Sequence, residues 1–403
     1  MKGVTAAVSP PGIVDTDALD QVRLDTSAPG LERPDANTLD LGSEPSSLDL
    51  VRPDLRDFAG YASARRVQAS GHIWLNANES PLPSPADDAG TLHRYPDPQP
   101  AQLRARMAAL YGVSAEQLML TRGSDEGIDL LVRAFCRAGI DRVLIAPPCF
   151  GMYAVCARVQ NAPLVEVPLI DGNGTWSLDS AGVVDAVREA GVRVVFLSSP
   201  ANPTGQALAL DAIGTLAKSL QGRAMLVIDE AYAEYSDVAS ASSLLAMHSN
   251  LVVLRTLSKA HALAGARIGA VLAAAELIGL LRNLSAPYPL PAPSATLALA
   301  ALLEATVKGA LQRCADAVQE RQSMLRALEV TTGVRRVYPS SGNYLLVRFV
   351  DAQIAFDRLL AAGVVVRDMR AMPQLEDALR ISIGTSDENA ALLAALQPEP
   401  ASC

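Results

Sequence analysis

Lys259 is the side chain whose setting in this sequence most favours chemistry. It lies in "LRTLSKAHALAGARIG" (residues 254–269), where Thr256 and Ser258 precede it and small residues follow. A buried ammonium group is costly unless it is paired or loses its proton, so lysines usually lie on the surface. The apolar run "NLVVLRT" before it, however, predicts a strand buried on both faces, and ligands bind beyond the carboxyl ends of such strands. The position therefore favours a lysine that contacts a ligand.

Polar residues also follow two other predicted strands. "LVIDEAY" ends with Asp229 and Tyr232, and "FLSSPANPTGQ" ends with Asn202 in a turn sequence. In "LTRGSDEGIDLLVRAF" a glycine loop opens a helix, which Ser124 or Asp125 is expected to cap and whose free N–H groups suit an anion. Each feature alone has an ordinary explanation as a cap, a turn or a surface acid. Together, a lysine, an acid, an asparagine and an anion site suit pyridoxal phosphate, which carries an aldehyde, a basic ring nitrogen and a phosphate.

The elements that must position these residues follow an α/β pattern. Short apolar runs alternate with helical patterns, which predicts a mostly parallel sheet flanked by helices; the runs are "DRVLIAPP", "VRVVFLSSP", "AMLVIDEAY" and "NLVVLRTLS". In the helix opened by the glycine loop, Ile128, Leu131, Val132 and Phe135 recur at helical spacing. The proline-rich "APYPLPAP" marks a boundary. After a long helical segment, "NYLLVRF", "GVVVRD" and "ALRISIG" predict a second, smaller α/β domain.

These patterns divide the chain into four parts. We expect residues 1–50 to form an acidic, disordered tail, because they hold nine acidic and three basic side chains and few large apolar groups. Residues 51–80 are expected to form an N-terminal arm, 81–287 a large cofactor-binding domain, and 288–398 a small C-terminal domain.

Composition argues against several classes of partner. The chain has 403 residues, half of them hydrophobic, and a net charge of -9. An acidic excess disfavours nucleic acid, whose phosphates are bound by clustered Lys and Arg. No uninterrupted apolar run reaches the roughly 18 residues of a membrane helix, and the cysteines lack metal-ligand spacing. We therefore expect a cytoplasmic protein that binds no metal, membrane or nucleic acid.

Eight stretches resemble, in order, the motifs of the fold-type I, class II pyridoxal-phosphate-dependent aminotransferases. They are "NANESP", "RYPDPQP", "RGSDEGIDLLVRAF", "PPCFGMY", "SSPANPTGQ", "IDEAYAEY", "LRTLSKAHALAGARIG" and "ALRISIGT". The likeness runs from about residue 51 to 395 and is greatest to the histidinol-phosphate aminotransferases of this family.

The resemblance implies a role for each matching residue. Lys259 would form the Schiff base with the cofactor and transfer protons as general base and acid. Asp229 would pair with the ring nitrogen, and Asn202 and Tyr232 would donate to the phenolic oxygen. The cofactor's phosphate would meet five residues from two segments of the chain: Ser124, Asp125, Thr256, Ser258 and Arg267.

Three aromatic positions carry further implications. Tyr95 resembles the tyrosine that reaches the cofactor's phosphate from the neighbouring subunit, which implies a homodimer with shared active sites. Phe150 stands where the family usually has a tyrosine stacked on the cofactor ring, so it keeps the stacking and lacks the hydroxyl. His261 stands where phenylalanine is common, and we expect a packed histidine without a catalytic role.

The resemblance also implies the substrates. Arg380 matches the arginine that binds the substrate anion, and Tyr61 and Arg367 match positions near the phosphate of histidinol phosphate. The expected reaction transfers an amino group reversibly between L-histidinol phosphate and 2-oxoglutarate, giving imidazole acetol phosphate and glutamate, in histidine biosynthesis. Three alternatives remain: a threonine-phosphate decarboxylase-like lyase, an aminotransferase for aromatic or other amino acids, and a regulatory module that binds pyridoxal phosphate without catalysis.

Overall fold

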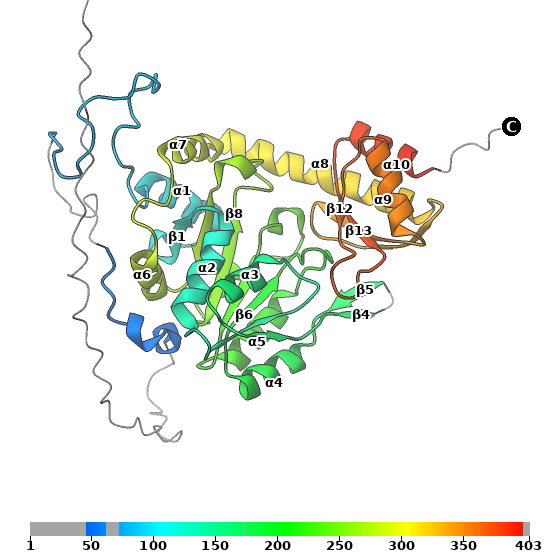
Figure 1. The fold of residues 1–403 in the computed structure, drawn as a ribbon, viewed down its shortest axis with the longest axis horizontal. Helices are drawn as coiled ribbons and strands as arrows, with labels where there is room; N and C mark the ends of the chain where they lie inside the picture. Colours follow the sequence, from blue (N-terminus) through cyan, green and yellow to red (C-terminus); the bar gives the residue numbers. More distant parts are fainter. Residues whose placement is uncertain (1–45, 62–71, 173, 398–403) are drawn as a thin grey trace, which may run out of the picture. The chain divides into compact units, whose positions relative to one another are not determined.

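The computed structural model describes residues 46–61, 72–172 and 174–397. Seven strands of this part form one sheet in the order β1-β9-β8-β7-β6-β2-β3 (Figure 1). The strands are β1 (Leu118–Thr121), β2 (Arg142–Ile145), β3 (Leu164–Glu166), β6 (Val192–Ser198), β7 (Met225–Asp229), β8 (Leu251–Thr256) and β9 (Gly269–Leu272). The strand β9 pairs antiparallel with β1 and β8, and the other four strand pairs of this sheet are parallel. The predicted mostly parallel sheet is confirmed; the sequence pattern did not indicate β1, β3 and β9.

Helices cover both faces of this sheet, which is why its strands are continuous apolar runs. One face packs against α1 (Ala101–Tyr111), α4 (Ser180–Ala190), α5 (Leu210–Leu220) and α7 (Ala292–Ala301). The other packs against α2 (Gly123–Phe135), α3 (Met152–Val159) and α6 (Ala275–Leu284). All six residues of β8 are buried. The carboxyl ends of β6, β7 and β8 are therefore rigidly held at one edge of the sheet.

Helix α2 follows β1 directly and differs from the prediction at its first turn. Its predicted apolar face is confirmed, since Ile128, Leu131, Val132 and Phe135 are buried. The helix begins at Gly123 after an N-cap at Arg122 that makes no side-chain capping bond. The predicted capping by Ser124 or Asp125 is therefore wrong. Both residues lie inside the first turn, so the helix backbone sets the direction of their side chains.

A second sheet holds four antiparallel strands in the order β10-β11-β13-β12. They are β10 (Val334–Tyr338), β11 (Tyr344–Phe349), β12 (Arg367–Asp368) and β13 (Ala378–Ser382). Most of the predicted strand "GVVVRD" lies outside β12. A separate core joins this sheet to α8 (Glu304–Glu329), α9 (Ala352–Ala361) and α10 (Ser386–Leu396).

Helix α7 packs on the core of the seven-stranded sheet, although it lies beyond residue 287, the expected domain boundary. The packing changes from one core to the other along α8, and we propose that the domain boundary lies there. Among the described residues no single helix is long and apolar enough to span a membrane; only α7 and α8 taken together, bent by 77°, meet that test.

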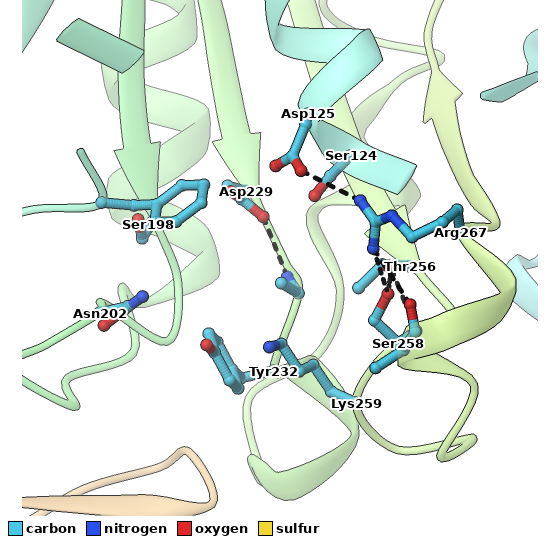
Figure 2. A pocket seen from close by; sticks show the side chains of 13 residues that line it. Ser124, Asp125, Ser198, Asn202, Asp229, Tyr232, Thr256, Ser258, Lys259 and Arg267 are labelled. Carbon is cyan, nitrogen blue, oxygen red and sulfur yellow. Dashed lines mark hydrogen bonds and ion pairs between the residues drawn. The ribbon is translucent and has the colours of Figure 1, made fainter. Parts of the chain in front are cut away.

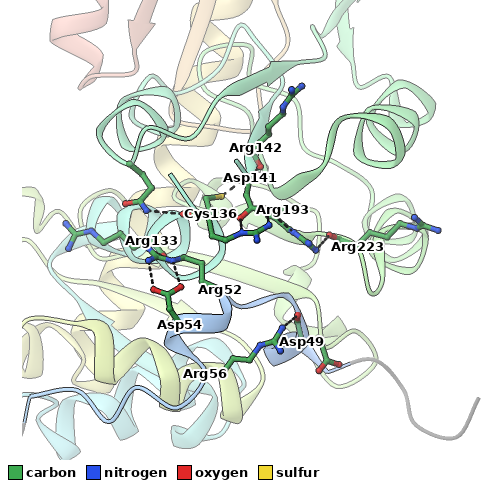
Figure 3. Close-up of polar contacts among 12 residues, drawn as sticks. Asp49, Arg52, Asp54, Arg56, Arg133, Cys136, Asp141, Arg142, Arg193 and Arg223 are labelled. Atoms are coloured by element: carbon green, nitrogen blue, oxygen red, sulfur yellow. Dashed lines mark hydrogen bonds and ion pairs between the residues drawn. The ribbon is translucent and has the colours of Figure 1, made fainter. Parts of the chain in front are cut away.

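The segment around residues 46–56 lies against α2 and α6 (Figure 3). Leu50 and Val51 are buried against α2 and α6. The backbone N–H of Arg52 donates to the carbonyl of Ala134 (3.0 Å), and its guanidinium to that of Arg133 (3.2 Å). Residues 46–50, which the sequence analysis assigns to the tail, thus pack on the sheet domain; residues 1–45 lie outside the described part of the chain.

Candidate functional site

A cavity of about 160 Å³ opens at the carboxyl ends of β6, β7 and β8 and the first turn of α2 (Figure 2). Ten of the eleven residues predicted to bind the cofactor line it: Ser124, Asp125, Phe150, Asn202, Asp229, Tyr232, Thr256, Ser258, Lys259 and Arg267. Ser198, Ala231 and Ala264 complete the lining. Residues separated by more than a hundred positions in the sequence therefore form one site.

Hydroxyls and a guanidinium gather at one end of the cavity (Figure 2). Nη2 of Arg267 lies 3.0 Å from Oδ2 of Asp125, and its Nη1 donates to the hydroxyl of Ser258 (3.5 Å). The hydroxyl of Thr256 donates to that of Ser258 (2.9 Å). Arg267 has left-handed backbone angles (φ 56°, ψ 51°), a conformation that is unfavourable for non-glycine residues and concentrates at functional sites. This end of the cavity suits an anion.

Two glycines let the backbone come close at this end. A Cβ on Gly123, whose φ is +74°, would lie 2.4 Å from Nη2 of Arg267. A Cβ on Gly269, at the start of β9, would lie 2.5 Å from the backbone of Gly123 and 2.7 Å from the nitrogen of Ser124. Gly269 therefore lets β9 approach the backbone of the first turn of α2, and Gly123 has a left-handed backbone conformation that residues with side chains rarely adopt.

Asp229 ends β7 at the base of the cavity and is 5% exposed. Its Oδ2 accepts a hydrogen bond from the hydroxyl of Tyr153 (2.8 Å), and its Oδ1 accepts from the N–H of Ala231 (3.1 Å). Burial raises the pKa of Asp229 to about 6, while the bond from Tyr153 opposes that rise. A cationic or protonated partner in the cavity would favour the charged carboxylate.

Lys259 projects into the cavity beside Tyr232 (Figure 2), with Nζ 5.5 Å from the ring centre of that tyrosine. Desolvation and the positive charge of Arg380 lower the pKa of Lys259. The side chain remains exposed to the cavity. A lysine of lowered pKa in an open cavity has the properties of a nucleophile or a general base.

Arg380 joins the four-stranded sheet to the cavity. From β13 it donates through Nη1 to Oδ1 of Asn202, which leaves the amide nitrogen of Asn202 as its donor for a ligand. Its guanidinium lies 5.6 Å from the ring centre of Tyr344. The hydroxyl of Tyr344 donates to the carbonyl of Ala201 (2.7 Å), and its ring meets that of Tyr232 edge-on at 5.0 Å.

Sequence reasoning missed the residues that hold the site from behind. Tyr153 lies within the quoted motif "PPCFGMY", but no spacing signal indicated the direction of its hydroxyl. Arg255, buried in β8, pairs with Glu230 (2.7 Å) and Glu234 (2.6 Å) and ties the end of β7 to β8. Glu230 is itself buried, and a buried acid is costly unless a cation pairs with it, as Arg255 does here.

Four predicted residues are not part of the cavity lining: Arg380, which contacts the lining residue Asn202, and Tyr95, Tyr61 and Arg367. Tyr95 is 50% exposed and stacks on Tyr288 at 4.4 Å. Tyr61 is 65% exposed, and Arg367 is exposed in β12, where it pairs in register with Arg380. Their expected roles stay predictions. His261 is buried, as expected for a packed histidine, and burial lowers its pKa.

The comparisons with known proteins agree with this geometry. The family model described as aminotransferase class I and II matches residues 66–396. A histidinol-phosphate aminotransferase from Stenotrophomonas maltophilia (strain R551-3) is 58% identical over 349 residues, which are 87% of this chain and 96% of that relative. One from Xylella fastidiosa (strain 9a5c) is 55% identical over 353 residues, which are 88% of this chain and 97% of that relative.

A solved structure has the same fold. It is the histidinol-phosphate aminotransferase from Sinorhizobium meliloti in complex with pyridoxal-5'-phosphate, which is 26% identical to this chain with a TM-score of 0.68. The match covers 79% of this chain and 88% of that one.

Proposed function

Since the chain belongs to the class I and II aminotransferase family, we propose that it transfers the amino group between L-histidinol phosphate and 2-oxoglutarate, giving imidazole acetol phosphate and glutamate. The observation that carries the proposal is one cavity that joins a lysine of lowered pKa, a buried carboxyl and an anion-binding end. The identity of 55 to 58% to histidinol-phosphate aminotransferases supports this choice of substrate.

The cavity fits pyridoxal phosphate as the cofactor. Arg267, Thr256 and Ser258 would hold its phosphate at the end where Gly123 and Gly269 admit the backbone. Asp229 would hold the ring nitrogen, Asn202 and Tyr232 would hold the phenolic oxygen, and Lys259 would hold the aldehyde carbon. When bound, the cofactor supplies an electron sink for the bond broken at the substrate's α-carbon.

Lys259 is the base that the cavity offers for proton transfer. A lysine amine accepts a proton only when it is neutral, and desolvation together with the charge of Arg380 shifts Lys259 toward that state. Asp229 would keep the ring nitrogen protonated, since a carboxylate favours a cation held against it. The lysine and the acid would therefore have separate functions at the two sides of the cofactor.

Arg380 is positioned to bind the substrate's anionic end. Its guanidinium borders the cavity through Asn202, and a guanidinium can pair with either a carboxylate or a phosphate through two parallel hydrogen bonds. One residue can therefore serve glutamate and histidinol phosphate in turn. Tyr61 and Arg367 would contribute to the phosphate of histidinol phosphate.

The proposal includes a cytoplasmic homodimer. Tyr95 lies outside the cavity of its own chain, with half of its side chain exposed. This exposure leaves it accessible for a second subunit's cofactor phosphate. Analytical ultracentrifugation together with mixing of Tyr95→Phe and Lys259→Ala chains would test whether sites are shared, because shared sites would restore part of the lost activity in mixed dimers.

A panel of amino donors assayed with 2-oxoglutarate tests the proposed reaction. Glutamate should form fastest with L-histidinol phosphate and more slowly with aromatic amino acids. Release of carbon dioxide from threonine phosphate without glutamate formation would instead support the lyase. Purified Lys259→Ala protein serves as the control, because it removes the proposed base and keeps the rest of the cavity.

A further inference from the structure

Behind the cavity, Asp229 contacts a buried tyrosine that the proposed function does not use. Tyr153, on α3, is fully buried, and its hydroxyl lies 2.8 Å from Oδ2 of Asp229 and 2.8 Å from the hydroxyl of Ser198. Its ring stacks on Phe196 at 4.9 Å and meets Phe150 edge-on at 5.7 Å. The packed ring fixes the place of the hydroxyl, so the carboxyl group of Asp229 is held from a constant direction.

The three groups form a hydrogen-bond chain that can run in either direction. A tyrosine hydroxyl has one proton. When Asp229 is charged, Tyr153 donates to the carboxylate and Ser198 donates to Tyr153. When Asp229 is neutral, it can donate to Tyr153, which then donates to Ser198. Both states are satisfied, but the bond to the charged carboxylate is the stronger one.

We propose that Tyr153 and Ser198 are positioning residues for Asp229, which orient its carboxyl group toward the cofactor cavity and stabilise its charged form. The inference rests on the proposed function in one respect, because the proposed function is what places the cofactor's ring nitrogen against Asp229. The hydrogen-bond chain stabilises the charged carboxylate of Asp229 in a buried position, where a carboxylate without donors would take up a proton.

The pH dependence of Asp229 follows from its surroundings. The titratable groups that face it are Tyr153 on α3, Asp125 on α2, the adjacent Glu230, Tyr232 and Lys259 in the cavity, and Tyr344 on β11. Burial raises the pKa of Asp229 to about 6, and the bond from Tyr153 lowers it. Removal of that bond should therefore raise the pKa further, so that a larger fraction of Asp229 is neutral at pH 7.

The test compares three variants of the full chain. Tyr153→Phe removes the first hydroxyl and keeps the ring, and Ser198→Ala removes the second. Tyr111→Phe is the control, since Tyr111 is likewise a buried tyrosine but has no bond to Asp229. The carboxyl carbon of Asp229 is titrated by ¹³C NMR in protein from which any bound cofactor has been removed, and its signal is assigned by its loss in Asp229→Asn.

We expect the midpoint to rise by about 1 to 2 pH units in Tyr153→Phe, the shift that corresponds to one charge-assisted hydrogen bond. It should rise less in Ser198→Ala and stay unchanged in Tyr111→Phe. Binding of pyridoxal 5'-phosphate, followed by fluorescence, should weaken toward acid pH at a correspondingly higher midpoint.

An unchanged or lower midpoint in Tyr153→Phe would overturn the inference. If this variant does not fold, as judged by near-ultraviolet circular dichroism, an unmoved midpoint in Ser198→Ala overturns it instead. The carboxyl titration needs neither cofactor nor substrate. If the midpoint shifts but the protein does not bind the cofactor or does not form glutamate, the proposed function fails while this inference stands.

Discussion

The cofactor side and the substrate side of the cavity are built differently. The proposed cofactor side consists of residues at the ends of β6, β7 and β8 and in the first turn of α2. Ten of its eleven residues line the cavity of one chain, and the eleventh, Tyr95, is exposed. Of the three residues proposed for the substrate side, only Arg380 contacts a residue of the cavity lining, Asn202, whereas Tyr61 and Arg367 are exposed. Strand ends therefore bring the proposed cofactor residues together in the fold itself, and we expect the exposed residues on peripheral segments to gain their contacts from a ligand or a second subunit.

The comparison predicts a hierarchy of effects. Changes on the cofactor side should abolish chemistry, because those residues already hold their positions. Changes on the substrate side should weaken binding in a substrate-dependent way, because those residues gain their contacts only in the complex.

Lys259→Ala should have the largest effect. Because no second lysine lines the cavity among the described residues, turnover should fall by about 10²- to 10⁴-fold or more, the contribution of a positioned base. The yellow colour expected from a cofactor bonded to this lysine should be lost. Borohydride reduction and peptide mapping of the unchanged protein should find the cofactor on Lys259; an adduct on another lysine would contradict the assignment.

Asp229→Asn should come next. The buried amide cannot favour a protonated ring nitrogen, so turnover should fall by about 10²- to 10³-fold, as for the loss of one charge-stabilising group. Thermal unfolding of the variant should stay close to that of the unchanged protein. Activity within a few-fold of the original would show that Asp229 is not the partner of the ring.

Arg380→Lys tests the one substrate residue that borders the cavity. Loss of a charge-assisted hydrogen bond should weaken both substrates by about 1.5 to 3 kcal/mol, since lysine replaces a planar fork with a point charge. Half-reactions titrated separately with glutamate and with histidinol phosphate would measure this. An unaffected glutamate half-reaction would rule out a shared anion site.

Tyr61→Phe and Arg367→Ala should have smaller and selective effects. Each residue is exposed in the free chain, so each should weaken histidinol phosphate by about 0.5 to 1.5 kcal/mol, the net range of one hydrogen bond. Glutamate has fewer anionic oxygens at that end and should be affected less. Equal losses of affinity for glutamate and histidinol phosphate would contradict the proposed selectivity of Tyr61 and Arg367 for the phosphate.

Removal of residues 1–45 should have the smallest effect. The segment is polar and acidic with few large apolar groups, so activity should stay within about two-fold and the oligomeric state should not change. Sedimentation velocity and the glutamate assay would check this. A variant that begins at residue 52 is the matched comparison, because it also lacks the buried Leu50 and Val51. Its unfolding temperature should be lower than that of the unchanged protein.

The sequence predicted the two sides unequally, for a physical reason. Asn202, Asp229 and Thr256 follow apolar runs that can only be buried strands, so their convergence at one edge is a consequence of parallel pairing. The strands β1, β3 and β9 were not predicted: β3 has only three residues, and β1 and β9 hold one β-branched residue each, whereas the predicted β2, which is as short as β1, holds two. Short strands take their conformation from neighbours, which local sequence does not reveal.

The supporting residues were harder to predict than the lining residues. Tyr153 reads as one apolar position of a helix, and its bond to Asp229 depends on how α3 packs on β6 and β7. Tyr344 reads as the first residue of a strand, although its hydroxyl reaches Ala201 in another domain core. Both contacts join parts of the chain whose relative placement is set by tertiary packing.

The close approach of Gly123 and Gly269 limits how this protein can change by descent. Any substitution at Gly269 adds at least one carbon atom 2.5 to 3.0 Å from backbone atoms, and any substitution at Gly123 adds one 2.4 Å from Nη2 of Arg267 at a left-handed φ of +74°. At Gly265, by contrast, an added carbon would meet no atom within 4 Å. Gly265 therefore has room for alanine, whereas the other two glycines can be replaced only if α2 and β9 move apart, at Gly269, or if Arg267 moves and the backbone strain is tolerated, at Gly123. At the anion-binding end of the cavity, the feature that must be kept is therefore the space left by two absent side chains.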